Sequence, residues 1–172
     1  VRQALIKSVD RSRLAENLFW GYSNPAYGVL SSATPNYWEG VEEYYPYDPE
    51  GAAALLEEAG WTRGDDGIWE KDGQDLSVHA LSMLEPDTGV AIQSALRDNG
   101  IVYDIENVTK ARQDELIMGS DYGMGEIRWV SNDPSVLRIP FHSSNIPEPG
   151  VFKFNWMRVA SEELDTMLAE AT

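Results

Sequence analysis

The sequence predicts an α/β fold. Two stretches with alternating apolar residues, 76–81 and 101–108, predict strands. Residues 85–99 lie between them and carry apolar side chains at helical spacing. A strand, a helix and a strand in this order predict two parallel strands joined by a right-handed crossover. The sequence contains no internal repeat.

The first 19 residues predict two short helices. Apolar side chains form a rough helical stripe here, made by Ala4, Leu5, Val9, Leu14, Leu18 and Phe19. Asp10 breaks the stripe and is suited to cap a second helix that ends near Leu18.

Residues 20–46 predict a long loop rich in glycine, proline and aromatic residues. Long loops of this kind are usually functional or disordered, and the aromatic content argues against disorder. The aromatic side chains either line an apolar or stacking pocket or fasten the loop to the domain. The sequence leaves both interpretations open.

The clearest helix follows this loop. Asp48 is a predicted N-cap, Pro49 suits the first helical position, and Gly60 is the predicted stop. Residues 63–67 predict a turn, and residues 71–73 predict a hairpin turn.

Shorter elements are expected in the last third of the chain. The pattern predicts a helix at 110–118, a strand at 122–129, a helix start at 134–139 capped by Asp133, and a last helix at 161–168 capped by Ser161. Residues 143–149 predict another loop.

Composition excludes several function classes. The chain has 172 residues and 13 Lys+Arg against 29 Asp+Glu, for a net charge of −16. This charge disfavours nucleic acid and anionic lipid as partners. The absence of cysteine excludes disulfides and thiolate zinc sites, and two histidines leave little room for a histidine-rich metal centre. We therefore expect no cofactor and no bound metal.

The acidity itself has two interpretations. Four of the 13 cations are lysine and nine are arginine, a pattern seen in proteins adapted to salty surroundings. The alternative is a solvated surface that stays soluble through self-repulsion.

The two ends of the chain fall within predicted helices. We expect that the first residues are not a signal peptide, and no apolar run in the sequence approaches the roughly 18 residues of a membrane span. The length suits one globular domain. We expect an excised segment of a longer protein.

No enzyme motif is present. The sequence has no glycine-rich phosphate loop, no Gly-x-Ser-x-Gly and no His-x-x-x-His. His79 falls in a strand pattern, which favours a structural role. His142 falls at a loop entry, where side chains often face a ligand. We expect that the protein is not an enzyme.

Several motifs together resemble one family. They are Val1–Leu5 with Val9–Arg11, Gly21-Tyr22 with Pro25-Ala26 and Gly28, Tyr45–Glu50 with Ala54–Trp61, Ile92–Leu96 with Gly100-Ile101, and Trp129 with Asp133-Pro134 and Phe141–Ser144. In this order they resemble the C-terminal lobe of the extracytoplasmic solute-binding proteins of peptide and nickel ABC importers, family 5. The resemblance covers nearly the whole chain.

The resemblance implies a type II periplasmic-binding-protein-like lobe, with a mixed central sheet flanked by helices. Residues 1–172 would form a single α/β lobe of a two-lobe receptor and supply half of an interlobe cleft. The family implies hinge closure over a small solute, delivery to the membrane permease of an ABC importer, and an extracytoplasmic location.

The expected solute is an oligopeptide or a related compound such as an oligosaccharide. Peptide-binding relatives hold the peptide amine with the Asp of a Trp-x-x-Asp pattern. Here Asn132 stands at that spacing from Trp129, and Asp133 follows it. An amide binds an ammonium less strongly than a carboxylate does, which weakens the case for a peptide.

The candidate cleft residues come from loops at the ends of elements. They are Trp20, Tyr22, Asn24, Trp129, Asn132, Asp133, His142 and Asn155. Asp133 or Asn132 would meet a ligand amine or hydroxyl, and Trp20 and Trp129 would stack or fill pockets. Two alternatives remain: a hydrolase domain with paired carboxylates at about 5–9 Å, and a receptor-like sensor module.

Overall fold

The computed structural model describes residues 1–82, 86–126, 131 and 133–171. Its backbone separates into two compact units. The first comprises residues 1–28, 39–107 and 123–126, and the second comprises residues 29–38, 108–122 and 127–172. The expectation of one lobe over 1–172 stays a prediction.

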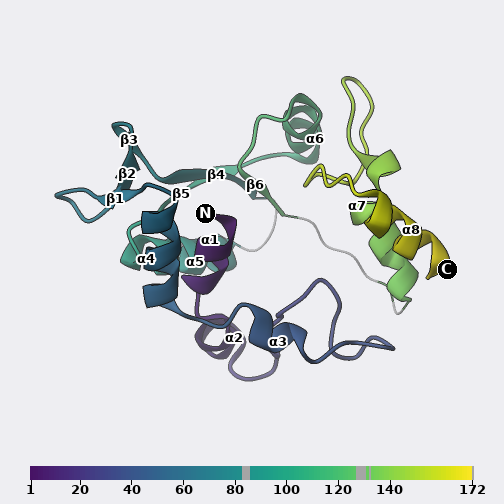
Figure 1. Ribbon diagram of the computed structural model, residues 1–172, viewed down its shortest axis with the longest axis horizontal. Helices are drawn as coiled ribbons and strands as arrows, with labels where there is room; N and C mark the ends of the chain where they lie inside the picture. The colour runs from purple at the N-terminus through teal and green to yellow at the C-terminus, as the bar shows by residue number, and fades with distance from the viewer. Residues whose placement is uncertain (83–85, 127–130, 132, 172) are drawn as a thin grey trace. The chain divides into compact units, whose positions relative to one another are not determined.

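A parallel sheet is the centre of the first unit (Figure 1). Its strand order is β5-β4-β6, with β4 at Ser77–Ser82, β5 at Val102–Asn107 and β6 at Met124–Gly125. Helix α5 (Pro86–Asp98) connects β4 to β5 and packs against β5. The predicted strand–helix–strand unit is therefore confirmed, with Ser77 paired to Val102 and Ser82 to Asn107.

A small antiparallel sheet precedes the parallel one. It has the order β1-β2-β3, formed by Thr62–Arg63, Trp69–Lys71 and Gln74–Asp75. The predicted turn at 71–73 joins β2 to β3, and Asp72 and Gly73 both adopt positive φ there. The pairing of β1 with β2 was not predicted, since two residues carry no periodicity.

Helices α1 (Arg2–Lys7) and α4 (Pro49–Glu58) pack against each other. The side chain of Asp48 caps α4 by accepting from the Gly51 N–H at 2.8 Å, and it also meets the Lys7 ammonium at 2.9 Å. Helix α2 (Arg11–Phe19) follows α1 and contacts α5, with Asp10 as the predicted cap. The predicted loop contains one short helix, α3 (Val41–Tyr44).

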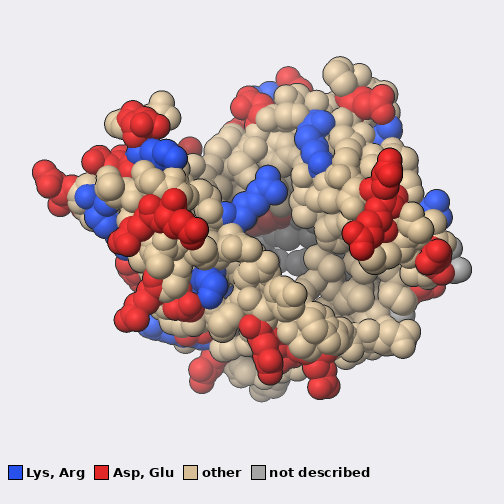
Figure 2. Space-filling view, in the orientation of Figure 1, with Lys and Arg blue, Asp and Glu red and all other residues tan. Residues whose placement is uncertain are grey.

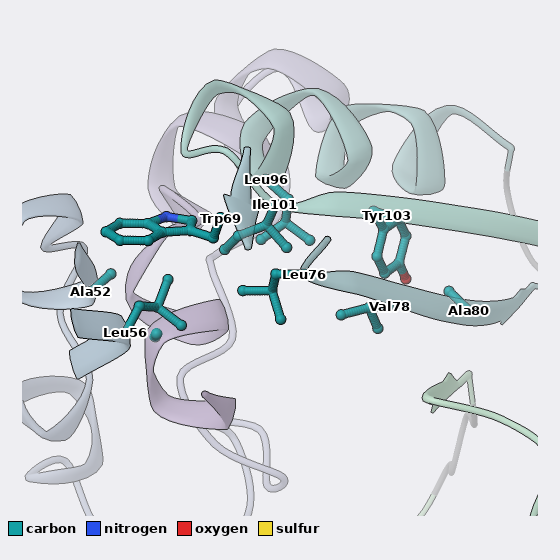
Figure 3. Close-up of a cluster of buried hydrophobic side chains, with 10 residues drawn as sticks. Ala52, Leu56, Trp69, Leu76, Val78, Ala80, Leu96, Ile101 and Tyr103 are labelled. Carbon is teal, nitrogen blue, oxygen red and sulfur yellow. The ribbon is translucent and has the colours of Figure 1, made fainter. Parts of the chain in front are cut away.

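The core of the first unit lies where α1, α4 and α5 meet the two sheets (Figure 3). Trp69 is its largest side chain and only 2% exposed, and it packs with Leu56, Leu96 and Ile101. The indole N–H donates to the Asn99 carbonyl at 3.0 Å, so the one polar atom of the ring is paired. The Arg63 guanidinium lies over the Trp69 ring, 4.4 Å from the ring centroid.

The second unit is built from short helices and loops. Its helices are α6 (Lys110–Gly119), the 3₁₀ turn η1 (Pro134–Leu137), α7 (Arg138–Phe141), the 3₁₀ turn η2 (Ser143–Asn145) and α8 (Glu162–Glu170). The predicted caps Asp133 and Ser161 are confirmed, since they accept from the N–H groups of Ser135 and Leu164. The predicted strand at 122–129 is described only as far as residue 126, and β6 takes two residues of it.

Candidate functional site

The carboxyl edge of the parallel sheet is the first candidate surface. In open α/β sheets, ligands bind outside the carboxyl ends of the strands. Here β4 ends at Ser82, β5 at Asn107 and β6 at Gly125, and the register places Ser82 opposite Asn107. Polar residues therefore end β4 and β5 at this edge, and Glu126 directly follows β6.

Glu126 is held at this edge by its neighbours. Its backbone N–H donates to the Leu81 carbonyl at 3.4 Å, which continues the pairing one residue beyond β6. Its carboxylate accepts from the hydroxyl of Ser82 at 3.3 and 3.2 Å, and Ser82 is buried. Burial first, and the negative charge of Glu126 second, raise the pKa of Tyr103. The edge thus presents a positioned, half-buried carboxylate.

Sequence reasoning missed Ser82 and Glu126 as site residues. They are 44 residues apart and share no motif. The available signal for Ser82 was its position directly after the predicted strand at 76–81, which the fold rule singles out. Glu126 falls inside the predicted strand at 122–129, so no such signal indicated it.

Three predicted site residues lie in the loop that follows α2. Trp20 is 82% exposed, Tyr22 is 91% exposed, and Asn24 is also exposed. Trp20 adopts a left-handed backbone conformation, with φ 50° and ψ 35°, which is uncommon for a bulky side chain. These side chains are displayed to solvent and do not fasten the loop, which leaves them available to a ligand.

The other described candidates lie in the second unit. Asp133 caps η1, and the Ser135 amide and hydroxyl hold the pKa of that carboxyl below its usual range. His142 caps η2, since its Nδ1 accepts from the Ser144 N–H at 3.2 Å. Trp129 and Asn132 lie outside the described residues, so their predicted roles stay predictions.

Asn155 is fully buried at 0% exposed. Its amide nitrogen donates to the carbonyls of Phe141, His142 and Val159, and its amide oxygen accepts from the Val159 N–H. The structure therefore brings Asn155 and His142 together, through a backbone carbonyl. This geometry describes a residue that braces the loops around α7 and η2.

Asp165 ties the start of α8 to η2. Its carboxylate accepts from the Ser143 hydroxyl and, at 2.8 Å, from the Ser143 N–H. These two bonds, and then the charge of His142 at 3.7 Å, lower the pKa of Asp165. The bonds favour the ionised carboxylate in the folded chain.

Asp165 should contribute a pH-dependent part of stability. A carboxyl whose pKa is lowered by folding stabilises the fold at pH values above its pKa in the unfolded chain, about 3.9. This contribution is lost as the pH falls through the pKa of the folded chain. We expect the melting temperature of the wild type to be higher than that of Asp165→Asn at pH 6. The difference between the two melting temperatures should close below about pH 4. A gap that stays constant from pH 6 to pH 2.5 would contradict this role.

Two negative findings concern the described residues. In that part of the chain, no cluster of three His, Asp or Glu side chains is arranged to hold a metal ion. No described helix has both the length and the apolar composition that crossing a bilayer requires.

Comparison with known proteins gives one consistent family. Residues 1–147 match the bacterial extracellular solute-binding proteins, family 5. Heme-binding protein A of Haemophilus influenzae is 30% identical over 179 residues, which cover 99% of this chain and 30% of that protein.

Two solved structures have the same fold as the chain. NikZ from Campylobacter jejuni in complex with Ni(L-His) is 28% identical with a TM-score of 0.78, and the oligopeptide-binding protein AppA from Bacillus subtilis in complex with a nonapeptide is 25% identical with a TM-score of 0.80. Each match covers 98% of this chain and 34% of the other. The chain thus spans about a third of the length of the relatives it matches.

Proposed function

Since the chain belongs to the bacterial extracellular solute-binding proteins of family 5, we propose that it supplies part of the solute-binding surface of an ABC-importer receptor. The match over 147 of its 172 residues carries this proposal. The resemblance to this family, the type II periplasmic-binding-protein fold class and the extracytoplasmic location that they imply are confirmed. Delivery of the solute to a membrane permease belongs to the proposal.

The proposed surface has two kinds of contact. The edge of the parallel sheet supplies Ser82 and Glu126, whose carboxylate suits a cationic or hydrogen-bond-donating group of a solute. The loop after α2 supplies Trp20 and Tyr22, whose exposed rings suit apolar or planar groups. Asp133 and His142, in the second unit, stay predicted ligand contacts.

We propose a peptide or a comparably compact solute as the ligand. The matching proteins are named for haem, for a nickel–histidine complex and for peptides. None of these names supports the oligosaccharide expected as one alternative. Acidic side chains are scattered over the visible surface (Figure 2), so the net charge does not single out one site.

The alternatives from the sequence receive no specific support. The hypothesis of a hydrolase requires two carboxylates that converge on one pocket. The family to which the chain belongs consists of solute-binding proteins. We propose that the chain acts by binding alone. A sensor role would require a signalling domain in the complete gene product.

A solute panel tests the proposal. The complete gene product is titrated with a nonapeptide, Ni(II)–histidine and haem, and its thermal unfolding is recorded. One class should stabilise the protein by an amount that grows with the logarithm of its concentration, and that reaches about 2.7 kcal/mol at 100 times its Kd. Stabilisation by none of the three classes would count against the receptor function.

A further inference from the structure

Arg11, at the start of α2, contacts two separate parts of the 20–47 region. One guanidinium nitrogen donates to the carbonyl of Ala26 at 3.3 Å, and the other donates to the carbonyl of Tyr45. The same guanidinium lies 4.6 Å from the centroid of the Tyr27 ring. One side chain thus joins the first helical turn of α2 to the loop after α2 and to the end of α3.

Neighbouring contacts reinforce this junction. The hydroxyls of Ser12 and Tyr27 are 3.0 Å apart, which places a second hydrogen bond between α2 and the loop. A side chain at Gly28 would lie 3.2 Å from a methyl group of Val41, so the backbone at Gly28 passes close to α3. These contacts fix the loop at its far end, while Trp20, Tyr22 and Asn24 stay exposed.

An exposed loop that is mobile before binding loses conformational entropy when it binds a ligand, and this loss weakens the affinity. A loop that the fold has already ordered avoids most of this loss. The side chains of Trp20 and Tyr22 are mostly exposed, so burial does little to order them. A planar guanidinium can order such a loop by donating to two carbonyls and stacking on a ring at the same time. A lysine ammonium in its place could make only some of these contacts.

We propose that Arg11 is the positioning residue of the loop at residues 20–28. It orders the backbone between Trp20 and Gly28 and thereby sets the affinity of this surface for its solute. The effect on affinity rests on the proposed function, whereas the effect on the loop does not.

The test compares variants on one helix of the complete gene product. Arg11→Ala removes both donors and the stacking face, and Arg11→Lys keeps the charge. Arg13→Ala is the matched control, because Arg13 is exposed two residues further along α2 and its loss changes the charge equally. Each variant is assayed by amide hydrogen exchange of residues 20–28 and by calorimetric titration with the solute that the panel identifies.

Arg11→Ala should raise exchange in residues 20–28 by about tenfold and weaken solute binding by about tenfold at a temperature where all variants are folded. Arg11→Lys should fall between the wild type and Arg11→Ala in both assays. Arg13→Ala should match the wild type. Equal exchange in Arg11→Ala and Arg13→Ala would overturn the proposal.

The two assays separate the two proposals. Faster loop exchange with unchanged affinity would refute the link between Arg11 and binding. If the wild type binds no solute, the receptor function fails, and hydrogen exchange alone then decides whether Arg11 orders the loop.

Discussion

Replacing Trp69 by alanine should lower the free energy of unfolding by about 3–5 kcal/mol. Trp69 is 2% exposed and is the largest side chain in the core of the first unit. Its removal leaves a cavity beside Leu56 and Ile101, an unpaired Asn99 carbonyl and an Arg63 without its stacking partner. Urea unfolding followed by far-UV circular dichroism measures the change.

Trp20→Ala is the matched control for this measurement. Trp20 is 82% exposed, so its replacement should change stability by no more than about 0.5 kcal/mol. If Trp69→Ala does not fold, Trp69→Phe keeps most of the core volume and should cost about 1–2 kcal/mol. A Trp69→Ala protein within about 1 kcal/mol of the wild type would contradict the assigned core.

The second large effect is expected at Asn155. Replacement by alanine removes the donor to the carbonyls of Phe141, His142 and Val159 and the acceptor for the Val159 N–H, all in a buried setting. Leaving buried polar groups unpaired should cost about 3 kcal/mol. Amide hydrogen exchange in η2 and α8 measures this loss within the second unit.

Asn145→Ala provides the control. The Asn145 amide makes one exposed hydrogen bond, to the Arg138 carbonyl at 3.0 Å. Its loss should cost no more than about 1 kcal/mol. If Asn155→Ala retained wild-type exchange in η2 and α8 and lost only solute affinity, the bracing role would be wrong and the predicted ligand contact would gain support.

Local signals in the sequence predicted most elements. The helix caps were predicted correctly at Asp10, Asp48, Asp133 and Ser161. They could be predicted because a cap depends on residues only two or three positions away. The parallel pairing of β4 and β5 followed from the crossover rule. These features depend on short stretches of chain, which a single sequence displays directly.

Long-range geometry could not be predicted in the same way. The Ser82–Glu126 contact and the junction at Arg11 join residues 15 to 44 positions apart, and only the fold brings them together. Asn155 shows the converse problem. A polar residue in a loop pattern indicates a ligand contact as readily as a buried brace, and only its hydrogen bonds distinguish the two.

The most direct test of the central claim is calorimetric titration of the complete gene product with the peptide, the nickel–histidine complex and haem. We predict a single saturable site for one class, with weaker binding in Trp20→Ala and in Glu126→Gln, while Glu16→Gln on α2 binds as the wild type does. Binding by none of the classes, or binding that both site variants leave unchanged, would contradict the claim that these residues form a receptor's solute-binding surface.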